Sequence, residues 1–233
     1  MTEAGGRALI EARDLHRSYA LGQARVPAVR GVSISVGAGE FVALQGPSGS
    51  GKTTLLNLLG LLDAPDSGRV DVDGREAATL SEDERSDLRR DRFGFVFQTF
   101  NLIPVLTAEE NVAYPLTLKG VEGSAGRARA RELLASVGLP DKAQVRPDLL
   151  SGGQRQRVAI ARALANDPEI VFADEPTANL DSHTADGILE LMREINASRR
   201  VAFLFATHDP NVVRRARRVV TLHDGLVESD VRA

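Results

Sequence analysis

The sequence of 233 residues predicts an α/β protein whose core is a parallel β-sheet. It holds several short, unbroken apolar runs rich in β-branched and aromatic residues, and helical patterns separate these runs. Such runs are typical of strands buried on both faces, and the helices between them provide the crossovers that parallel strands need. For any single run, a buried turn of helix is the alternative interpretation. Each run ends in polar or charged residues, and ligands bind at the carboxyl ends of parallel strands. We therefore expect these residues to converge on one site.

The composition excludes several classes of function. Hydrophobic residues make up 42% of the chain and charged residues 26%, which is ordinary for a globular domain. The chain has no cysteine, which excludes a disulfide framework, a thiol nucleophile and a zinc–thiolate site. A net charge of -3 provides no broad basic surface, so we expect no nucleic-acid partner. The most apolar stretch, residues 55–62, is much shorter than the roughly 20 residues of a membrane-spanning helix. The N-terminus does not resemble a secretory signal, so we expect an unexported chain that reaches a membrane only through a partner.

The elements follow in chain order. Residues 9–13, 32–36 and 68–74 alternate between apolar and polar side chains, which predicts half-exposed strands in an antiparallel layer beside the core. The capping box Thr107-Ala-Glu-Glu110 and an amphipathic run at 127–137 that ends at Gly138 predict an inserted helical subdomain. The turn Asp224-Gly225 predicts a closing hairpin. The four buried strands are expected at 41–44, 93–97, 170–173 and 201–206.

These elements predict a single domain with two parts. Residues 1–97 and 155–233 are expected to form the catalytic core with its antiparallel layer. Residues 98–154 are expected to form the helical subdomain.

A glycine-rich segment directly follows the first buried strand and opens the helical run from Thr54 to Leu62. Its pattern, G-x-x-x-x-G-K-[ST], is that of a phosphate-binding loop, in which backbone N–H groups surround phosphate oxygens. Lys52 is expected to hold the β- and γ-phosphates, and the Thr53 hydroxyl to bind Mg²⁺. The alternative is an ordinary glycine–serine turn. The expected nucleotide ligands are Gly46, Pro47, Ser48, Gly49, Ser50, Gly51, Lys52, Thr53 and Thr54.

Polar side chains at the ends of the other buried strands complete a candidate hydrolytic site. Asp174 is expected to bind the metal ion, and Glu175 to act as the general base that activates water. Gln98 and His208 follow two further strands, where they would contact the γ-phosphate, the metal or the attacking water. The other histidines, His16, His183 and His223, are interpreted as surface residues.

A second anion-binding feature begins the helical run 155–164. The segment Ser151-Gly152-Gly153-Gln154 combines a capping box with glycines that leave the helix N-terminus open to an anion. From the residues alone, the two anion sites could serve one nucleotide or two.

The order of these motifs resembles that of the ATP-binding cassette (ABC) ATPases over essentially the whole chain. In that family they are the Walker A, Q-loop, signature, Walker B, D-loop and H-switch motifs, the D-loop being Ala178-Asn-Leu-Asp181. The resemblance implies a RecA-like P-loop NTPase core, the cofactors ATP and Mg²⁺, and Tyr19 stacked on adenine. It also implies a head-to-tail dimer, with a second copy or a paralogous ATPase, in which Mg²⁺ is held by Thr53, Gln98 and Asp174. The residues that would reach the neighbouring chain's ATP are Ser151, Gly152, Gly153, Gln154 and Asp181.

Within the family, the segments 80–85, 93–104 and 106–112 resemble the LolD/MacB branch, which drives export or lipoprotein release. This implies a permease that docks near Gln98–Pro104 and a location on the cytoplasmic face of the inner membrane. Phe100, Leu102 and Ile103 are the candidate contacts, although they are equally suited to packing the helical subdomain. An FtsE-like ATPase with a force-transmitting partner is the alternative, followed by an importer ATPase. A DNA-repair or translation ATPase is disfavoured by the single compact cassette and the net negative charge.

Overall fold

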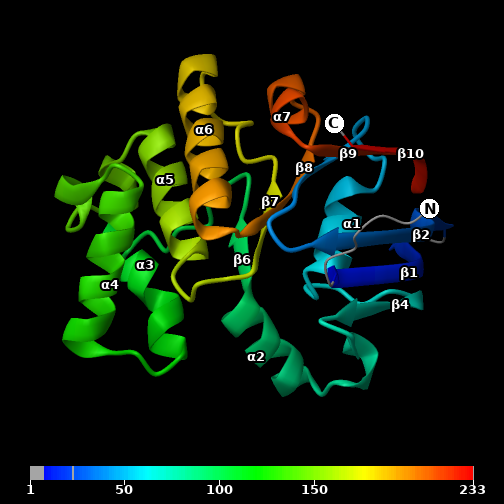
Figure 1. Cartoon of the computed structure of the whole chain (residues 1–233), viewed down its shortest axis with the longest axis horizontal. Coiled ribbons are helices and arrows are strands. Elements are labelled where there is room, and N and C mark those ends of the chain that lie inside the picture. The colour runs from blue at the N-terminus through cyan, green and yellow to red at the C-terminus, as the bar shows by residue number, and fades with distance from the viewer. Residues whose placement is uncertain (1–7, 23, 233) are drawn as a thin grey trace.

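The computed structural model describes residues 8–22 and 24–232, and Figure 1 shows their arrangement. The strands are β1 (Ala8–Leu21), β2 (Ala24–Gly37), β3 (Phe41–Gln45), β4 (Ser67–Val72), β5 (Arg75–Glu76), β6 (Phe93–Val96), β7 (Ile170–Asp174), β8 (Ala202–Thr207), β9 (Arg218–His223) and β10 (Leu226–Arg232). The α-helices are α1 (Lys52–Leu59), α2 (Glu82–Arg92), α3 (Ala108–Leu118), α4 (Gly123–Ser136), α5 (Gly152–Ala163), α6 (Ser182–Arg199) and α7 (Pro210–Arg215). Short 3₁₀ turns occur at Ala77–Thr79, Pro140–Lys142 and Pro147–Leu149.

The strands form two sheets. The larger sheet has the order β10-β9-β3-β8-β7-β6, in which all neighbours are parallel except the pair β9–β10. The smaller sheet has the order β2-β1-β4-β5 and is antiparallel throughout. The predicted α/β fold is thus confirmed, with its parallel core, its antiparallel N-terminal layer and its closing hairpin.

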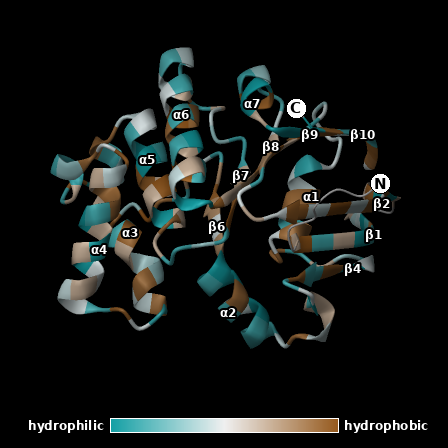
Figure 2. Ribbon diagram, in the orientation of Figure 1, coloured by the Kyte–Doolittle hydropathy of each residue, from teal (hydrophilic) through white to brown (hydrophobic). Residues whose placement is uncertain are grey.

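Alternate residues of the central strands enter two separate hydrophobic cores. Phe41 and Phe205, whose ring centroids are 4.7 Å apart, belong to the core shared with α3, α4, α5 and α6. Val42 and Leu204 belong to the core shared with α1 and the antiparallel sheet. The helix α1 therefore lies on one face of the parallel sheet and α5 on the other, as Figure 1 shows. In Figure 2, α4, α5 and α6 carry alternating hydrophobic and hydrophilic bands, as helices with one buried face do.

Local sequence signals explain most helix boundaries. The predicted capping boxes at Thr107 and Ser151 are both present, and they begin α3 and α5. The helix α1 begins at Lys52, two residues before the predicted start at Thr54. The division expected between residues 154 and 155 falls inside α5, and this helix packs against α3, α4 and β6. It therefore joins the helical subdomain to the sheet.

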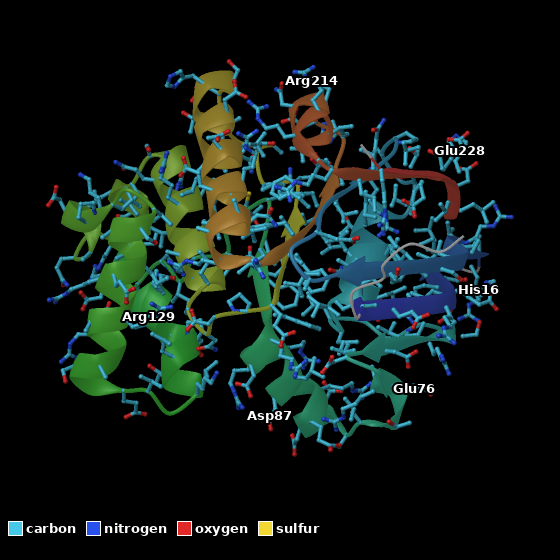
Figure 3. The ribbon with its side chains drawn as sticks, in the orientation of Figure 1. His16, Glu76, Asp87, Arg129, Arg214 and Glu228 are labelled. Atoms are coloured by element: carbon cyan, nitrogen blue, oxygen red, sulfur yellow. The ribbon has the colours of Figure 1, made fainter. Side chains whose placement is uncertain are left out.

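Charged side chains line the outside of the molecule. Of the residues that Figure 3 labels, His16 and Glu228 lie at the right edge of the view, Arg214 at the top and Asp87 at the bottom. The side chain of His16 is 45% exposed, with Nε2 3.2 Å from Asp14 Oδ1. His183 is also exposed, and so is His223, which agrees with the interpretation of these histidines as surface residues. Among residues 8–22 and 24–232, no helix has both the length and the apolar character needed to cross a bilayer.

The core contains one polar side chain whose replacement should stabilise the fold. Gln156 of α5 is fully buried, and neither polar atom of its amide has a hydrogen-bond partner among the described residues. An unsatisfied buried polar group costs about 1–3 kcal/mol. Gln156→Leu is therefore expected to raise the melting temperature by roughly 2–12 °C in a thermal unfolding experiment. Gln144→Leu is the matched control, because its amide donates to Glu109 over 3.3 Å and its loss should not stabilise the chain. An equal or lower melting temperature for Gln156→Leu would contradict the prediction.

Candidate functional site

The predicted phosphate-binding loop connects the central strand β3 to α1. The loop lies close to the main chain around it, and Gly51 is one of its two tightest points, together with Gly46. The φ of Gly51 is 98°, and a Cβ atom there would lie 2.2 Å from the Ala28 carbonyl oxygen, so only glycine fits. Ser50 is 2% exposed, and its hydroxyl has no partner among the described residues. A close-packed loop with a buried, unpartnered hydroxyl group is suited to binding phosphate oxygens.

The side chain of Lys52 is fixed inside this loop. It is 7% exposed, and its Nζ donates to the main-chain oxygens of Gly46 and Pro47, both at 2.8 Å. An ammonium group has three donors. Two of them hold the cation in place, which leaves the third for an anion that enters the loop.

The next residue links the loop to β7. The Thr53 hydroxyl donates to Asp174 Oδ1 over 2.9 Å. Burial raises the pKa of Asp174, and the negative charge of Glu175 adds to this effect, whereas Thr53 and Lys52 oppose it. A cation bound beside this carboxylate would relieve both the burial cost and the repulsion. Hydroxyl and carboxylate oxygens are ligands that Mg²⁺ prefers, so the pair fits this metal.

Glu175, directly after β7, is held by three hydrogen bonds. Its Oε2 accepts from the Thr207 hydroxyl at 3.1 Å, and its Oε1 accepts from the main-chain N–H of His208 at 3.2 Å. The Nδ1 atom of His208 lies 2.6 Å from the same Oε1. The Glu175 side chain is 15% exposed, whereas that of His208 is 71% exposed. The structure thus brings the predicted general base and the predicted histidine into direct contact, at the carboxyl ends of β7 and β8.

Gln98 lies two residues beyond β6, and its side chain is exposed. Its main-chain oxygen accepts from Asn179 Nδ2 over 2.8 Å, which ties this loop to the one after β7. Asn179 belongs to the predicted D-loop, but nothing in the sequence predicts this contact. A contact between residues 81 positions apart has no signal in a single sequence.

The turn after Gln98 is fixed by two arginines of α5 that the sequence analysis also missed. Phe100 and Asn101 have left-handed backbones, with φ values of 63° and 48°. Arg162 donates to the Phe100 oxygen over 2.8 Å and also to the Asn101 oxygen. The guanidinium of Arg155 lies 5.1 Å from the centre of the Phe100 ring. Arg155 and Arg162 are seven residues apart, so they lie on one face of α5. This spacing was the one sign in the sequence that the two arginines act on the same segment.

The second anion-binding segment begins α5 as expected. The Ser151 hydroxyl accepts from Gln154 N–H at 3.3 Å, and Gln154 Oε1 accepts from Ser151 N–H at 3.0 Å. Gly152 packs against Leu180, since a Cβ atom there would lie 3.3 Å from a Leu180 methyl group. Asp181 caps α6 by accepting from Thr184 N–H at 3.0 Å, and its hydrogen bonds with Thr184 lower its pKa. The start of α5 therefore rests on the segment that carries Asp181.

Tyr19 lies near the end of β1, 40% exposed. Its hydroxyl donates to Asp63 Oδ2 over 2.9 Å, and the guanidinium of Arg17 lies 5.0 Å from the centre of its ring. Tyr19 pairs with Val26 in the antiparallel sheet, two residues from the Ala28 carbonyl that Gly51 contacts. The register thus places Tyr19 close to the phosphate-binding loop.

The three expected permease contacts lie in different environments. Leu102 packs against the helical core, and Phe100 lies beneath Arg155. Ile103 donates its main-chain N–H to Asn111 Oδ1 over 2.8 Å. Beside this segment is a groove of about 340 Å³ between α2, β6, α3 and α5. Apolar side chains, among them Phe95, Phe97 and Leu118, line it together with the arginines Arg89, Arg90 and Arg162.

Comparison with known proteins gives consistent results. A family model described as ABC transporter matches residues 29–178. The lipoprotein-releasing system ATP-binding protein LolD of Xanthomonas campestris is 49% identical over 220 residues, which cover 94% of this chain and 92% of LolD. The macrolide export ATP-binding/permease protein MacB of Syntrophobacter fumaroxidans is 49% identical over 224 residues, or 95% of this chain. The chain spans about a third of the length of the MacB relatives it matches, 31% in this case.

Among solved structures, the ATP-binding cassette MJ0796 superimposes with a TM-score of 0.89 and 44% sequence identity, and the match covers 96% of this chain and 98% of that one. One of its structures is a dimer in a post-hydrolysis state, bound to ADP and phosphate. A second structure, also of the dimer, matches equally well.

Proposed function

Because the chain belongs to the ABC transporter family of ATPases, we propose that it hydrolyses MgATP between two head-to-tail chains and drives a membrane permease. The observation that carries this proposal is the site at the carboxyl edge of the sheet. There the fixed Lys52 ammonium, the Thr53–Asp174 pair and the Glu175–His208 pair lie at the ends of β3, β7 and β8. A cation, two metal-ligand oxygens and a candidate base are the groups that phosphoryl transfer to water requires.

In this proposal the phosphate-binding loop holds the triphosphate, from Gly46 to Thr54. Its backbone N–H groups and Lys52 bind phosphate oxygens, and the start of α1 adds the positive end of a helix dipole. Thr53, Asp174 and Gln98 would hold Mg²⁺, which neutralises phosphate charge when bound. Tyr19 would stack on the adenine.

Glu175 acts as the general base in the proposed reaction. It takes a proton from water as the water oxygen forms a bond to the γ-phosphorus, and the bond from that phosphorus to the ADP oxygen breaks. His208, 2.6 Å from Glu175, holds the carboxylate in position and reaches the γ-phosphate from its exposed side chain. Gln98 orients the attacking water from the neighbouring loop.

The second chain supplies the other half of the site. Ser151, Gly152, Gly153 and Gln154 at the start of α5, together with Asp181, would contact the ATP held by the partner. The placement of α1 and α5 on opposite faces of the sheet supports this division, as do the dimers of MJ0796. The partner would be a second copy or a paralogous ATPase.

The groove beside Gln98–Pro104 is the proposed docking site for the permease. It lies between the loop of Gln98 and the C-terminal end of α5, so a membrane partner seated there would contact the loop of one proposed half-site and the helix that begins with the other. The names of the LolD and MacB relatives support a transporter for export or lipoprotein release, with this chain on the cytoplasmic face of the inner membrane.

Docking can be tested with a charge placed in the groove. Leu118 is 58% exposed and lines it, so Leu118→Arg is expected to lower recovery of the co-expressed permease at least tenfold in a pull-down from detergent-solubilised membranes. Burying a charge against an apolar partner is unfavourable. Leu149→Arg is the control, since Leu149 is 75% exposed and lies outside the groove. Undiminished recovery with Leu118→Arg would show that the permease docks elsewhere. ATP hydrolysis by the recovered complex, measured with and without Mg²⁺, tests the activity itself.

A further inference from the structure

Four charged and aromatic side chains connect the end of β1 to the loop that follows α1. Arg17 forms a two-bond pair with Asp63, from Nε at 3.0 Å and from Nη2 at 2.8 Å. A third bond, from Nη1 to Asp66 Oδ1, measures 3.1 Å. The same guanidinium lies 5.0 Å from the centre of the Tyr19 ring, and the Tyr19 hydroxyl donates to Asp63 over 2.9 Å. The three guanidinium nitrogens and the Tyr19 hydroxyl thus all donate to two carboxylates.

Asp66 also holds the main chain before Tyr19. Its Oδ2 accepts from the main-chain N–H of Ser18 at 2.8 Å, and its own main-chain N–H donates to the His16 oxygen at 2.8 Å. The strand that leads into Tyr19 is therefore fixed, as well as the Tyr19 hydroxyl. A paired arginine–carboxylate fork is rigid because its planar geometry allows two parallel bonds.

We propose that Arg17 and Asp63 are positioning residues for the nucleotide base, which hold the Tyr19 ring with one face covered by the guanidinium and the other turned to the adenine. This inference rests on the proposed stacking role of Tyr19. A cation is attracted to the face of an aromatic ring, so Arg17 occupies one face and a base would stack on the other. The hydroxyl bond to Asp63 fixes the position of the far end of the ring, and the guanidinium over one face limits the turning of the ring about its own axis.

The expected benefit is a lower ordering cost on binding. A free tyrosine side chain loses rotational freedom when a ligand stacks on it, whereas a ring already held in place has less freedom to lose. Loss of the support should weaken base binding about threefold to tenfold. It should leave the binding of the phosphates unchanged, because Lys52 and the loop hold them through separate contacts.

The test compares a ligand that has a base with one that has none. Arg17→Met keeps the length of the side chain and removes the fork. Its dissociation constant for ATP, measured by calorimetry with Mg²⁺, should rise about threefold to tenfold, while that for inorganic tripolyphosphate stays unchanged. Arg25→Met is the matched control, because it removes the same charge from the same neighbourhood. The Arg25 guanidinium lies 3.8 Å from Asp66, whereas the cation over the Tyr19 ring is that of Arg17. Arg25→Met should change neither constant.

Two further variants separate this inference from the stacking proposal. If Tyr19→Ala binds ATP as tightly as the wild type, Tyr19 does not contact the base and the stacking proposal fails. If Tyr19→Ala weakens ATP binding but Arg17→Met does not, the positioning role alone is wrong. An equal loss for ATP and tripolyphosphate in Arg17→Met would also overturn it. In the Tyr19→Ala background, Arg17→Met should cause no additional loss.

The mobility of the ring provides a readout that does not depend on binding. The chain has two tyrosines and no tryptophan. In the variant Tyr114→Phe, tyrosine fluorescence therefore comes from Tyr19 alone. In that background, Arg17→Met should lower the anisotropy of tyrosine fluorescence, whereas Arg25→Met should not. Unchanged anisotropy with Arg17→Met would show that Arg17 does not hold the ring.

Discussion

Glu175→Gln is expected to lower the rate of ATP hydrolysis by about 10²- to 10⁴-fold, the usual contribution of a general base. Glutamine has the shape of glutamate and retains an oxygen that accepts from Thr207 or His208, but it cannot take up a proton at neutral pH. ATP should still bind, because Lys52 and Thr53 are unchanged. Since hydrolysis would no longer separate the chains, ATP should hold them as a dimer, which size-exclusion chromatography detects.

The control for this substitution lies at the other end of the same strand, just before it begins. Glu169 precedes β7, and its side chain is 42% exposed beside Arg92. Glu169→Gln makes the same chemical change away from the carboxyl edge of the sheet, and it should hydrolyse ATP at the wild-type rate. If Glu175→Gln also kept that rate, Glu175 would not be the base.

Lys52→Met is expected to weaken ATP binding about 10- to 100-fold, which corresponds to the roughly 1.5–3 kcal/mol of a charged hydrogen bond. Methionine fills the volume of the buried lysine stem, so the change removes the ammonium without opening a large cavity. The two bonds to Gly46 and Pro47 show that this cation is already held in place before a ligand enters. The measurement is the dissociation constant of MgATP by calorimetry.

Lys119→Met provides the comparison. Lys119 follows α3, is 40% exposed and pairs with Asp91 at 3.5 Å, so its loss should leave the dissociation constant unchanged. Equal ATP affinity in Lys52→Met and in the wild type would contradict the phosphate-binding role of the loop.

The parallel core was predictable because it rests on runs of adjacent residues. The strands β3, β6, β7 and β8 begin and end within one or two residues of the apolar runs that indicated them. The helix α2 illustrates the opposite case. It has a capping box between Ser81 and Glu84, but none of its residues is buried. Because the helix has no buried face, its sequence lacks the apolar periodicity that indicates a helix, and it was not predicted.

The site was predictable to the extent that its residues belong to continuous motifs at strand ends. The partners of these residues were not. Asp63 is 44 residues from Tyr19, and Arg162 is 62 residues from Phe100. Such pairs depend on how α1 and α5 pack on the sheet. No local pattern in a single sequence shows which residues this packing brings together.

The contact at the start of α5 has a consequence for genetics. A Cβ atom on Gly153 would lie 2.4 Å from a Thr184 methyl group of its own chain, so any larger residue there must shift the Thr184 side chain of α6 before a second chain is considered. A loss-of-function allele at this position would therefore be ambiguous, since it reports a folding defect and a binding defect together. The neighbouring Ser151 is exposed, and an allele that alters its hydroxyl leaves α6 undisturbed. A selection that aims to isolate the binding defect should therefore mutate Ser151 rather than Gly153.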